Sequence, residues 1–406
     1  MKYTLRNYQQ EASDASIRFF RSSNNRNGVL VLPTGAGKSL VIADIASRLD
    51  DNVLVFQPSK EILAQNYDKL RSYGVTDCSI YSASFNSKEI RRITFATIGS
   101  VKSHMADFNH FKYIIVDECH TVNAQGGMYK EFFDCAKRKI LGLTATPYRL
   151  NSAQICLDEE GRYDPEAEPQ NMCILKFITR TRPRVFHDVI YQVDIQTLLM
   201  RGYLSKLNYY DMTVVEQQGL KRNSTGMDFD EQSLFDEFQR TGLQQHLVDI
   251  VRRLLKPKSG IPRKGILVFT KFLDESKKLC EDIEGCLMIS GDTPAKERSR
   301  IIEDFKSGRI KVLTNVGVLT TGFDYPELDT VVMARPTMSL AMWYQIVGRA
   351  IRPHPDKEAG WVVDLCGNIK RFGMVENLRL IEPKPGQYVI QGVADNQYKQ
   401  LTNCYF

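Results

Sequence analysis

Short segments that are apolar on both faces recur along the chain and alternate with segments whose apolar residues return at helical spacing. GVLVLP at 28–33 is the first of these runs, and Ile42, Ile45, Ala46 and Leu49 follow it with the period of a helix. A strand that lacks a polar face must be covered on both sides, which is what helices do in parallel sheets. The pattern therefore predicts an α/β fold.

Nine further runs of this kind lie in both halves of the chain. They are VLVFQ (53–57), ITFA (93–96), YIIVD (113–117), ILGL (140–143), ILVFT (266–270), CLMI (286–289), KVLTN (311–315), TVVMA (330–334) and WVVD (361–364). Two groups of buried strands, each interleaved with helices, predict two doubly wound parallel-sheet layers in tandem.

The connecting regions predict where these layers begin and end. We expect a first domain over residues 1–203, a second over 204–375, and a tail of unknown role over 376–406. The stretch near 151–175 contains DEEGRYDPEAEP, which is acidic and lacks apolar periodicity, and predicts a surface insertion. The segment 233–255 reads as one helix that packs on a domain.

Composition narrows the class of protein. Hydrophobic residues make up 43% of the 406 residues and charged residues 25%, as in ordinary globular chains. No run approaches about 18 apolar residues, so a membrane span is not expected, and the N-terminal segment lacks the apolar core of a signal peptide. The nine cysteines form no Cys-x-x-Cys pair, so we expect reduced thiols, no zinc ribbon and a cytoplasmic location.

A glycine-bearing loop joins the strand at 28–33 to the following helix. Its sequence is TGAGKS, and the strand, loop and helix order is the context that a phosphate site requires. Glycines let backbone N–H groups turn inward, the lysine can reach phosphates, and the hydroxyl can hold magnesium. The expected cofactor-binding residues are Thr34, Gly35, Ala36, Gly37, Lys38 and Ser39. The first position of the full phosphate-loop motif is Leu32 instead of glycine, so a chance glycine-rich turn is the weaker alternative.

The acidic pair in DECH (117–120) closes the strand YIIVD. The carboxyl ends of parallel strands share one edge of the sheet, which places the pair near the phosphate loop. We expect Asp117 to hold magnesium through water and Glu118 to take a proton from the attacking water. An acidic pair can instead merely cap the next helix. Taken alone, His120 is expected to be a surface residue and Cys119 a packing residue.

These motifs belong to a longer ordered series. The blocks are LRNYQQ, LPTGAGKS, QPSKEILAQ, FATIGS, DECH, LTATPYR, ILVFT, ISGDT, LTTGFD and QIVGRAIR, spread over roughly residues 3 to 370. In this order they resemble the superfamily 2 helicases and translocases of the DEAD/DEAH type, which are built from two RecA-like domains with an ATP cleft between them. Within that superfamily the chain looks most like the RadD family of bacterial DNA-repair ATPases, and more distantly like restriction-enzyme translocase subunits.

The resemblance assigns roles to residues that match the family motifs. It implies adenine recognition by Arg6 and Gln9, for which a simple helix start is the alternative, and a coupling segment at Thr144 and Thr146. It also implies ATP contacts for Gly322 and Asp324. It implies catalysis by Gln345, Arg349 and Arg352, with the two arginines one helical turn apart. The nucleic-acid contacts that it implies are Pro58, Ser59, Thr97, Ser290, Gly291 and Thr320.

The function implied is ATP- and Mg²⁺-dependent movement along a nucleic acid, most simply single-stranded or forked DNA in repair or replication, with repair or replication proteins as partners in a bacterial or phage-type nucleoid. An RNA helicase, an ATP-gated clamp and the motor subunit of a restriction or defence system remain open. RadD-type relatives tend to carry a cysteine-rich C-terminal segment. The chain lacks one, so either that module is absent or the sequence is a trimmed core.

Basic and aromatic residues outside the motifs have two interpretations each. Trp343 and Tyr344 could stack on bases, but core packing is favoured. Two basic clusters could follow phosphates, although a solvated linker is favoured. These clusters are Arg180, Arg182 and Arg184, and then Arg252, Arg253, Lys256, Lys258, Arg263 and Lys264.

Overall fold

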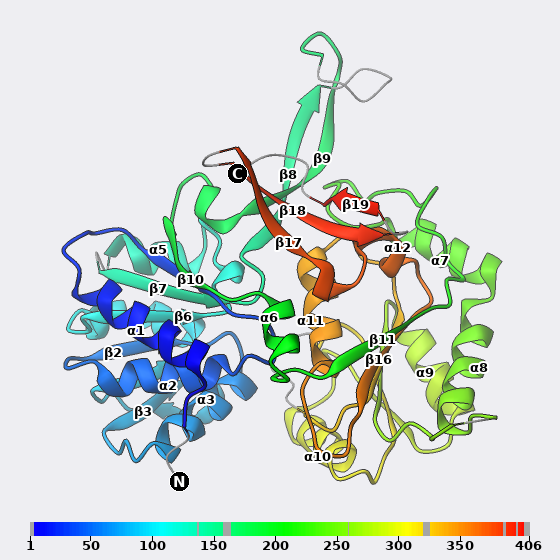
Figure 1. Ribbon diagram of the computed structural model, residues 1–406, viewed down its shortest axis with the longest axis horizontal. Coiled ribbons are helices and arrows are strands. Elements are labelled where there is room, and N and C mark those ends of the chain that lie inside the picture. Colours follow the sequence, from blue (N-terminus) through cyan, green and yellow to red (C-terminus); the bar gives the residue numbers. More distant parts are fainter. Residues whose placement is uncertain are drawn as a thin grey trace. The chain divides into compact units, whose positions relative to one another are not determined.

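The computed structural model divides the chain into two units (Figure 1). The first contains Met1–Arg149 and Lys176–Leu198, and the second contains Leu150–Leu175 and Leu199–Phe406. The chain thus leaves the first unit after Arg149 and contributes Leu150–Leu175 to the second unit. It then returns to the first unit for Lys176–Leu198 before it forms the rest of the second. The domain limits expected from the sequence at 203 and 375 stay predictions. The residues described are 4–135, 138–156, 164–258, 260–319, 325–384, 387–394 and 397–401.

The first unit is built on an eight-stranded sheet with the order β10-β1-β7-β6-β2-β5-β3-β4. Its pairs are parallel, apart from the antiparallel pair β3–β4. The strands are β1 (Gly28–Val31), β2 (Val53–Phe56), β3 (Cys78–Ser82), β4 (Ser87–Lys88), β5 (Ile93–Ala96), β6 (Tyr113–Asp117), β7 (Lys139–Thr144) and β10 (Asp188–Gln192). All five apolar runs of the first half form strands, and β2, β5 and β6 are buried throughout.

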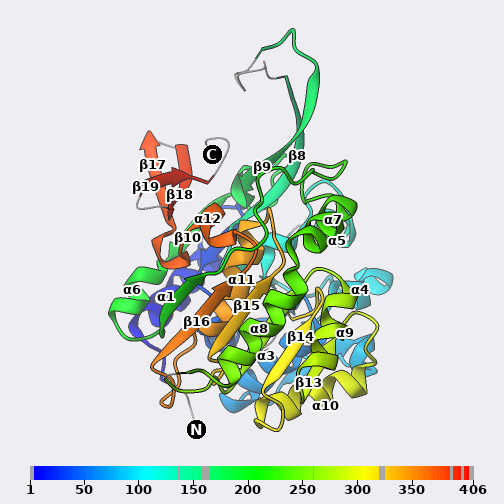
Figure 2. The ribbon, with the colours of Figure 1, turned by 90° about the vertical axis from the view of Figure 1, so that its right-hand side faces the viewer.

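Helices cover both faces of this sheet, as strands without a polar face require. The helix α2 lies between α1 and α3 on one face (Figure 1). The helices α4 and α5 are on the other face (Figure 2). Buried aromatic residues of the second face include Phe108 and Phe132, which pack against Phe56 and Tyr81 of the sheet. The helices are α1 (Asn7–Arg21), α2 (Lys38–Arg48), α3 (Lys60–Ser72), α4 (Ile98–Val101), α5 (Met128–Cys135) and, where the units join, α6 (Ile195–Met200).

The second unit contains a six-stranded parallel sheet with the order β11-β16-β15-β12-β14-β13. Its strands are β11 (Lys206–Asp211), β12 (Ile266–Thr270), β13 (Cys286–Ile289), β14 (Val312–Asn315), β15 (Thr330–Ala334) and β16 (Ala359–Asp364). Its helices are α7 (Glu231–Thr241), α8 (Leu243–Leu255), α9 (Leu273–Asp282), α10 (Ala295–Lys306), α11 (Leu340–Ala350) and α12 (Asn368–Phe372). The five apolar runs of the second half all form strands of this sheet, which confirms the prediction of two α/β layers.

One prediction made from the connecting regions needs correction. The segment 233–255 is two helices, because Gly242 adopts a left-handed φ of 63° that ends α7 and begins α8. In the region near 151–175, which was expected to be a surface insertion, β8 (Tyr148–Cys156) and β9 (Pro169–Phe177) form a two-stranded sheet. The tail contains a three-stranded antiparallel sheet of β17 (Arg379–Lys384), β18 (Gln387–Ala394) and β19 (Gln397–Gln400).

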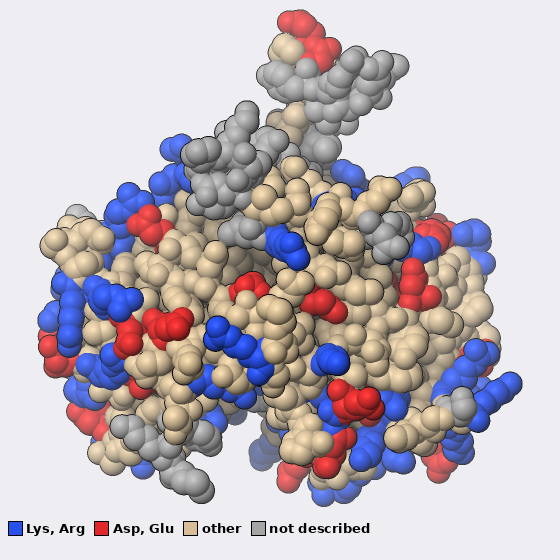
Figure 3. Space-filling model, viewed as in Figure 1, with Lys and Arg blue, Asp and Glu red and all other residues tan. Residues whose placement is uncertain are grey.

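The surface carries both signs of charge. On the face shown in Figure 3, Lys and Arg are interspersed with Asp and Glu, in keeping with a formal net charge of only +6. Within the described part of the chain, no helix is both long enough and apolar enough to span a bilayer.

Candidate functional site

The loop between β1 and α2 has the backbone of a phosphate cradle. Gly35 and Gly37 have φ values of 83° and 77°, a left-handed conformation that glycine adopts without a steric penalty. Gly37 is the N-cap of α2, so the helix begins at Lys38 with its N-terminus at the loop. Leu32, which replaces the first motif glycine, is fully buried, and its N–H donates to Thr144 O at 3.0 Å. The departure from the motif is therefore an apolar anchor to β7.

Helix α1 holds the loop from one side. The Tyr8 hydroxyl and the Gln9 Nε2 both donate to Ala36 O at 2.8 Å. The left-handed φ of Gly37 favours glycine, and a Cβ placed there would lie 2.5 Å from Gln9 Nε2, so the end of the Gln9 side chain would have to move. Gln9 Oε1 accepts from the N–H of Arg6, the N-cap of α1, at 2.9 Å. The helix-start interpretation of Arg6 and Gln9 is consistent with these bonds, and adenine recognition by them stays a prediction.

A chain of polar contacts joins Lys38 to the end of β7. Lys38 Nζ lies 3.2 Å from Glu118 Oε1, and His120 Nδ1 lies 3.4 Å from Glu118 Oε2. The same His120 nitrogen is 2.9 Å from Thr144 Oγ1, which also accepts from the Thr146 N–H at 3.0 Å. The expectation of a surface histidine is wrong, because only 11% of the His120 side chain is exposed. Motifs far apart in the sequence thus form one continuous network.

Glu118 is held in a strained and charged state. Its φ of 49° places a residue other than glycine in the left-handed region, which costs about 1–3 kcal/mol and is common at functional sites. Burial alone would raise its pKa, but the positive charge of Lys38 and the contact with His120 outweigh burial and lower the pKa to about 2. Glu118 is therefore an ionised carboxylate whose basicity is suppressed by its lysine partner.

Asp117 has the opposite shift. Burial, assisted by the negative charge of Glu118, raises the pKa of Asp117 to about 6. Its Oδ1 accepts from the Glu118 N–H at 2.9 Å, and its Oδ2 accepts from Asn66 Nδ2 at 3.0 Å. Asn66 Nδ2 also donates to Gln57 Oε1 at 2.9 Å. A buried carboxylate in this environment would gain from a nearby cation, which would remove the cost of ionisation.

Sequence reasoning missed Asn66 and Gln57. Both side chains are 1% exposed, and the structure assigns no hydrogen-bond partner to Asn66 Oδ1 or Gln57 Nε2 among the residues it describes. A signal was present, because Asn66 lies on the same face of the helix as Ile62 and Leu70, where an apolar residue is expected. A polar residue at a core position of a helix is a pointer to a buried network.

These residues suit a divalent cation and a triphosphate. Asp117 supplies a buried oxygen at the strand end, and Ser39 supplies a half-buried hydroxyl in the first turn of α2. Oxygen donors of this kind are what Mg²⁺ prefers. The cradle of left-handed glycines and the Lys38 ammonium match the charge of phosphates. Among the described residues, no group of three or more His, Cys, Asp or Glu side chains forms a separate metal cluster.

The second unit carries the remaining predicted catalytic residues. Gln345 and Arg349 are buried residues of α11. The expectation that both arginines occupy one helix is wrong, because α11 ends at Ala350 and Arg352 follows its C-cap. Trp343 is fully buried and donates from Nε1 to Gly373 O at 3.1 Å, which confirms core packing. Thr320, Gly322 and Asp324 lie outside the described residues.

The expected nucleic-acid contacts that the structure describes, which leaves out Thr320, follow strand ends. Ser59 caps α3 and its hydroxyl accepts from the Ile62 N–H at 3.3 Å, while Thr97 is the N-cap of α4. Ser290 and Gly291 directly follow β13, and Pro58 follows β2 by one residue. Each therefore lies at the carboxyl edge of its own sheet, where ligands of open α/β sheets bind. Their contacts with nucleic acid stay predictions.

Known families and relatives match both units. Residues 2–149 match the family model described as type III restriction enzyme, res subunit, and residues 246–354 match the helicase conserved C-terminal domain. These two matches support a superfamily 2 helicase. A 51.5 kDa protein of a Lactococcus phage is 24% identical over 84% of this chain and 66% of its own length. The DNA 3'-5' helicase XPB of Kineococcus radiotolerans is 26% identical over a match that covers 87% of this chain and 58% of its own length.

Another relative, the DNA 3'-5' translocase XPB2 of Sulfurisphaera tokodaii, is 23% identical over a match that covers 88% of this chain and 80% of its own length. Several curated relatives are longer, and the chain spans about half to two thirds of their length. Two solved structures share the fold. The ATP-dependent type ISP restriction-modification enzyme LlaBIII bound to DNA has a TM-score of 0.62 and 18% identity, and the match covers 90% of this chain and 28% of that one. Dbp5 of Saccharomyces cerevisiae has a TM-score of 0.57 and 14% identity, and the match covers 89% of this chain and 83% of that one. The predicted fold of two tandem RecA-like domains is thereby confirmed.

Proposed function

We propose that this superfamily 2 chain is an ATP-dependent DNA helicase or translocase that couples hydrolysis of ATP to movement along a strand. The observation that carries the proposal is the contact between Lys38 of the phosphate loop and Glu118 at the end of β6. A phosphate-binding lysine and a carboxylate beside it are the two groups that ATP hydrolysis needs in one place. The names of the XPB-type relatives support DNA as the polymer.

The geometry suggests how Glu118 becomes a base. While Lys38 is its partner, the pKa of Glu118 is too low for efficient proton abstraction, since a general base works best near the operating pH. Phosphates that draw Lys38 away would remove the largest stabilising contact, and the pKa of Glu118 would rise. We therefore propose that Lys38 suppresses Glu118 until a triphosphate engages the loop. This arrangement would limit hydrolysis to the loaded site.

The other site residues have proposed roles that follow their placement. Ser39, and Asp117 through water, would hold Mg²⁺, which would neutralise phosphate charge. The resemblance gives Gln345, Arg349 and Arg352 a part in hydrolysis, and such arginines contribute roughly 10³–10⁵ in turnover elsewhere. The nucleic-acid contacts proposed are Pro58, Ser59, Thr97, Ser290, Gly291 and Thr320.

The finer assignment is a DNA-repair role of the RadD type on single-stranded or forked DNA, inside the cytoplasm and with repair or replication proteins as partners. Its support is the motif set LRNYQQEA, LPTGAGKSLVIA, GLTATPYRL and QIVGRAIRP. Partners and location are proposed from this resemblance alone.

Steady-state ATP hydrolysis with Mg²⁺ tests the function. The protein is assayed alone and with single-stranded DNA, duplex DNA, a forked duplex and single-stranded RNA. We expect DNA to stimulate hydrolysis more than RNA does, and a strand-displacement assay then separates unwinding from translocation. Hydrolysis that is indifferent to every nucleic acid would contradict the motor proposal, and stronger stimulation by RNA would transfer it to RNA.

The control variants are Lys38→Ala, which removes the phosphate contact, and Glu118→Gln, which keeps the shape of the side chain but removes the base. Both are expected to abolish stimulated hydrolysis. If Lys38→Ala retained it, the assignment of the phosphate loop would be wrong.

A further inference from the structure

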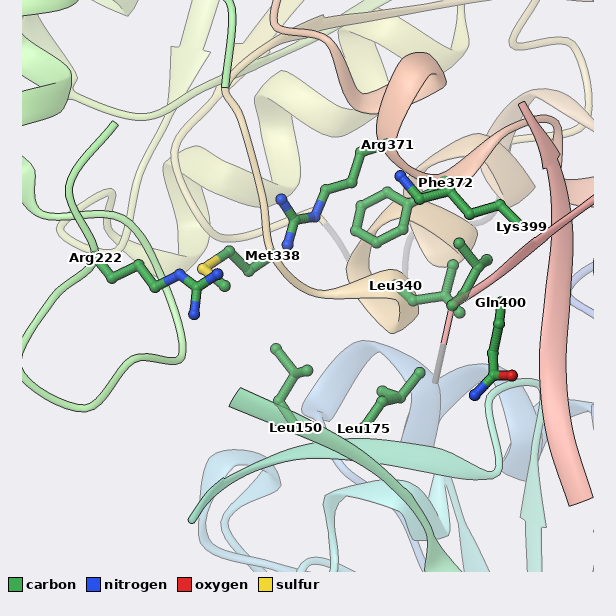
Figure 4. A pocket seen from close by; sticks show the side chains of 10 residues that line it. Leu150, Leu175, Arg222, Met338, Leu340, Arg371, Phe372, Lys399 and Gln400 are labelled. Atoms are coloured by element: carbon green, nitrogen blue, oxygen red, sulfur yellow. The ribbon is translucent and has the colours of Figure 1, made fainter. Parts of the chain in front are cut away.

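A cationic pocket on the second unit involves none of the residues assigned above. It has a floor of apolar side chains, among them Leu150, Leu340 and Phe372, and a basic rim (Figure 4). Its volume is ≈ 220 Å³. Sites for drug-sized small molecules begin at about 300 Å³, so the pocket suits a smaller group than a cofactor.

The rim gathers positive charge from three separate parts of the chain. Arg222 precedes α7, Arg371 lies on α12, and Lys399 lies on β19 of the C-terminal sheet. Arg222 and Lys399 are exposed, and the Arg371 guanidinium lies 5.5 Å from the centre of the Phe372 ring. Among the described residues that line the pocket, none carries a carboxylate. Like charges that converge without acidic neighbours favour an anionic ligand.

The position of the pocket relates it to the sheet edge that binds ligands in α/β folds. Met338 and Leu340, on either side of the N-cap of α11, line it, so the positive N-terminal end of that helix adds to the rim. Strand β15 leads into α11 and β16 leads into α12. The pocket is thus at the carboxyl edge of the same sheet as Ser290 and Gly291, which follow β13.

The spacing along this edge fits a continuous strand. Strand β15 is three steps from β13 in the sheet. At about 4.8 Å per step the separation is roughly 14 Å, which about four nucleotides would span at ~3.4 Å each. A nucleic acid held at Ser290 and Gly291 could therefore reach the pocket within a few nucleotides.

We propose that this pocket binds one nucleotide of a single-stranded nucleic acid, with the base on the apolar floor and its phosphates against Arg222, Arg371 and Lys399. The proposal rests on the proposed function, because it supposes a strand along this edge. A single strand is required because a base in a duplex is stacked and paired, whereas a free base can lie on an apolar surface. Guanidinium groups bind phosphate oxygens through paired N–H donors.

A binding measurement with the whole chain tests the pocket. The double variant Arg222→Ala with Lys399→Ala removes two rim charges, and Lys277→Ala with Lys278→Ala, on α9 away from the pocket, removes two exposed charges from the same unit. Fluorescence anisotropy with labelled oligodeoxythymidylate is followed across a salt series. Each phosphate contact contributes ~0.7 to the salt slope for single strands, so the rim variant should lose about 1.4.

The same relation gives the loss of affinity. With 1 M salt as the reference, the loss of two phosphate contacts lowers the affinity for the strand roughly 25-fold at about 0.1 M salt. The α9 variant should retain wild-type affinity and slope. Equal losses in the two variants would mean that the effect is general charge, and the pocket would be excluded. If the wild-type chain bound no strand at all, the proposed function would fail together with the pocket. If it bound and the rim variant were unaffected, only the pocket would fail.

Two further arms sharpen the result. Gln400→Glu places a carboxylate at the rim with almost no change of shape and should weaken binding roughly fivefold, as one lost phosphate contact does. Inorganic phosphate, added at constant ionic strength, should not displace the strand. Displacement from the wild type but not from the rim variant would identify a free-phosphate site and overturn the strand proposal. Tryptophan fluorescence verifies folding, because Trp343 and Trp361 are the two tryptophans of the chain and both lie in the second unit.

Discussion

Asp117 in the first unit and Asp364 in the second occupy matching places. Each is the last residue of a parallel strand, β6 and β16, and each is nearly or fully buried. Burial raises the pKa of both to about 6. By position, burial and pKa the two aspartates are indistinguishable.

Their hydrogen bonds distinguish them. Asp364 accepts from the Cys366 N–H at 3.0 Å, from Asn368 Nδ2 at 2.9 Å and from the Ile369 N–H at 2.7 Å. It therefore organises the turn into α12. Asp117 accepts from one backbone N–H and one amide, which leaves more of its lone pairs for a cation. A shifted pKa alone does not identify a functional carboxylate, and the donors that already point at it must be counted.

The largest effect is expected from substitution of Glu118, because the residues that follow the two aspartates differ. Glu118 follows Asp117, whereas the fully buried Leu365 follows Asp364. Glu118→Gln should lower DNA-stimulated turnover by about 10²–10⁴, the usual contribution of a general base. Steady-state hydrolysis measures this change, with ATP binding as the control for an intact site. If Glu118→Gln kept wild-type turnover, Glu118 would not be the general base, and function would no longer distinguish the two strand ends.

The same substitution in both aspartates gives the next effect. Asp364→Asn would leave a part-buried N–H of the α12 turn opposite an amide donor, which costs about 1–3 kcal/mol of unfolding free energy. Asp117→Asn should be close to neutral for stability, because flipped amides of Asn66 and Gln57 could use their unsatisfied atoms, yet it should lower hydrolysis.

Urea unfolding followed by tryptophan fluorescence reports the second unit, and circular dichroism reports both. If Asp117→Asn proved as destabilising as Asp364→Asn, or if Asp364→Asn removed activity without loss of stability, the distinction would fail.

Two left-handed N-cap glycines sharpen the comparison. Gly37 begins α2 and Gly367 begins α12, with φ values of 77° and 68°. Alanine at either position meets a backbone penalty of about 1–2 kcal/mol. Only at Gly37 would the added Cβ also displace a neighbour, the Gln9 Nε2 that holds Ala36 O, from a distance of 2.5 Å, whereas at Gly367 the nearest atom is Val215 O at 3.6 Å. We expect Gly37→Ala to weaken ATP binding at least tenfold and Gly367→Ala to lower stability alone, as nucleotide titration and thermal unfolding would reveal.

The smallest expected effect is on the pH dependence. Because the pKa of Asp364 is about 6 when folded and lower when unfolded, the folded chain binds more protons between about pH 4 and 6. The contribution of Asp364 to stability therefore falls as pH rises through this window. Asp364→Asn should flatten that part of the stability profile, measured by urea midpoints at several pH values. An unchanged profile would mean that this carboxyl titrates normally.

Much of the fold was predictable because the local signal and the tertiary environment agree. Every wholly apolar run became a strand of a parallel sheet, and TGAGKS and DECH came together as their sheet positions required. The strands that were missed, such as β11 and β19, have exposed and polar residues and depend on neighbours far away in sequence. Their pairing is set by tertiary context that a local pattern does not contain.

The candidate site was predictable where a motif names the residue and not where packing decides. Asp117 and Glu118 lie at the end of β6, and Lys38 begins the helix that follows the loop after β1, so sequence order places them. His120 contacts Thr144 across 24 residues, and Asn66 contacts Asp117 across 51. Whether such side chains point inward depends on the angle of a helix or turn, which sequence spacing does not specify.

The excursion of Leu150–Leu175 into the second unit has a consequence for synthesis on the ribosome. This segment emerges before the residues with which it lines the cationic pocket, since Lys399 follows Leu175 by 399 − 175 = 224 residues. At about 5–20 residues per second, roughly 10–45 s separate the two events. During that interval the first unit can complete its folding. The side chains of Leu150 and Leu175 meanwhile lack the later residues that line the rest of the pocket. A nascent chain stalled before β19 would thus present an apolar surface to chaperones.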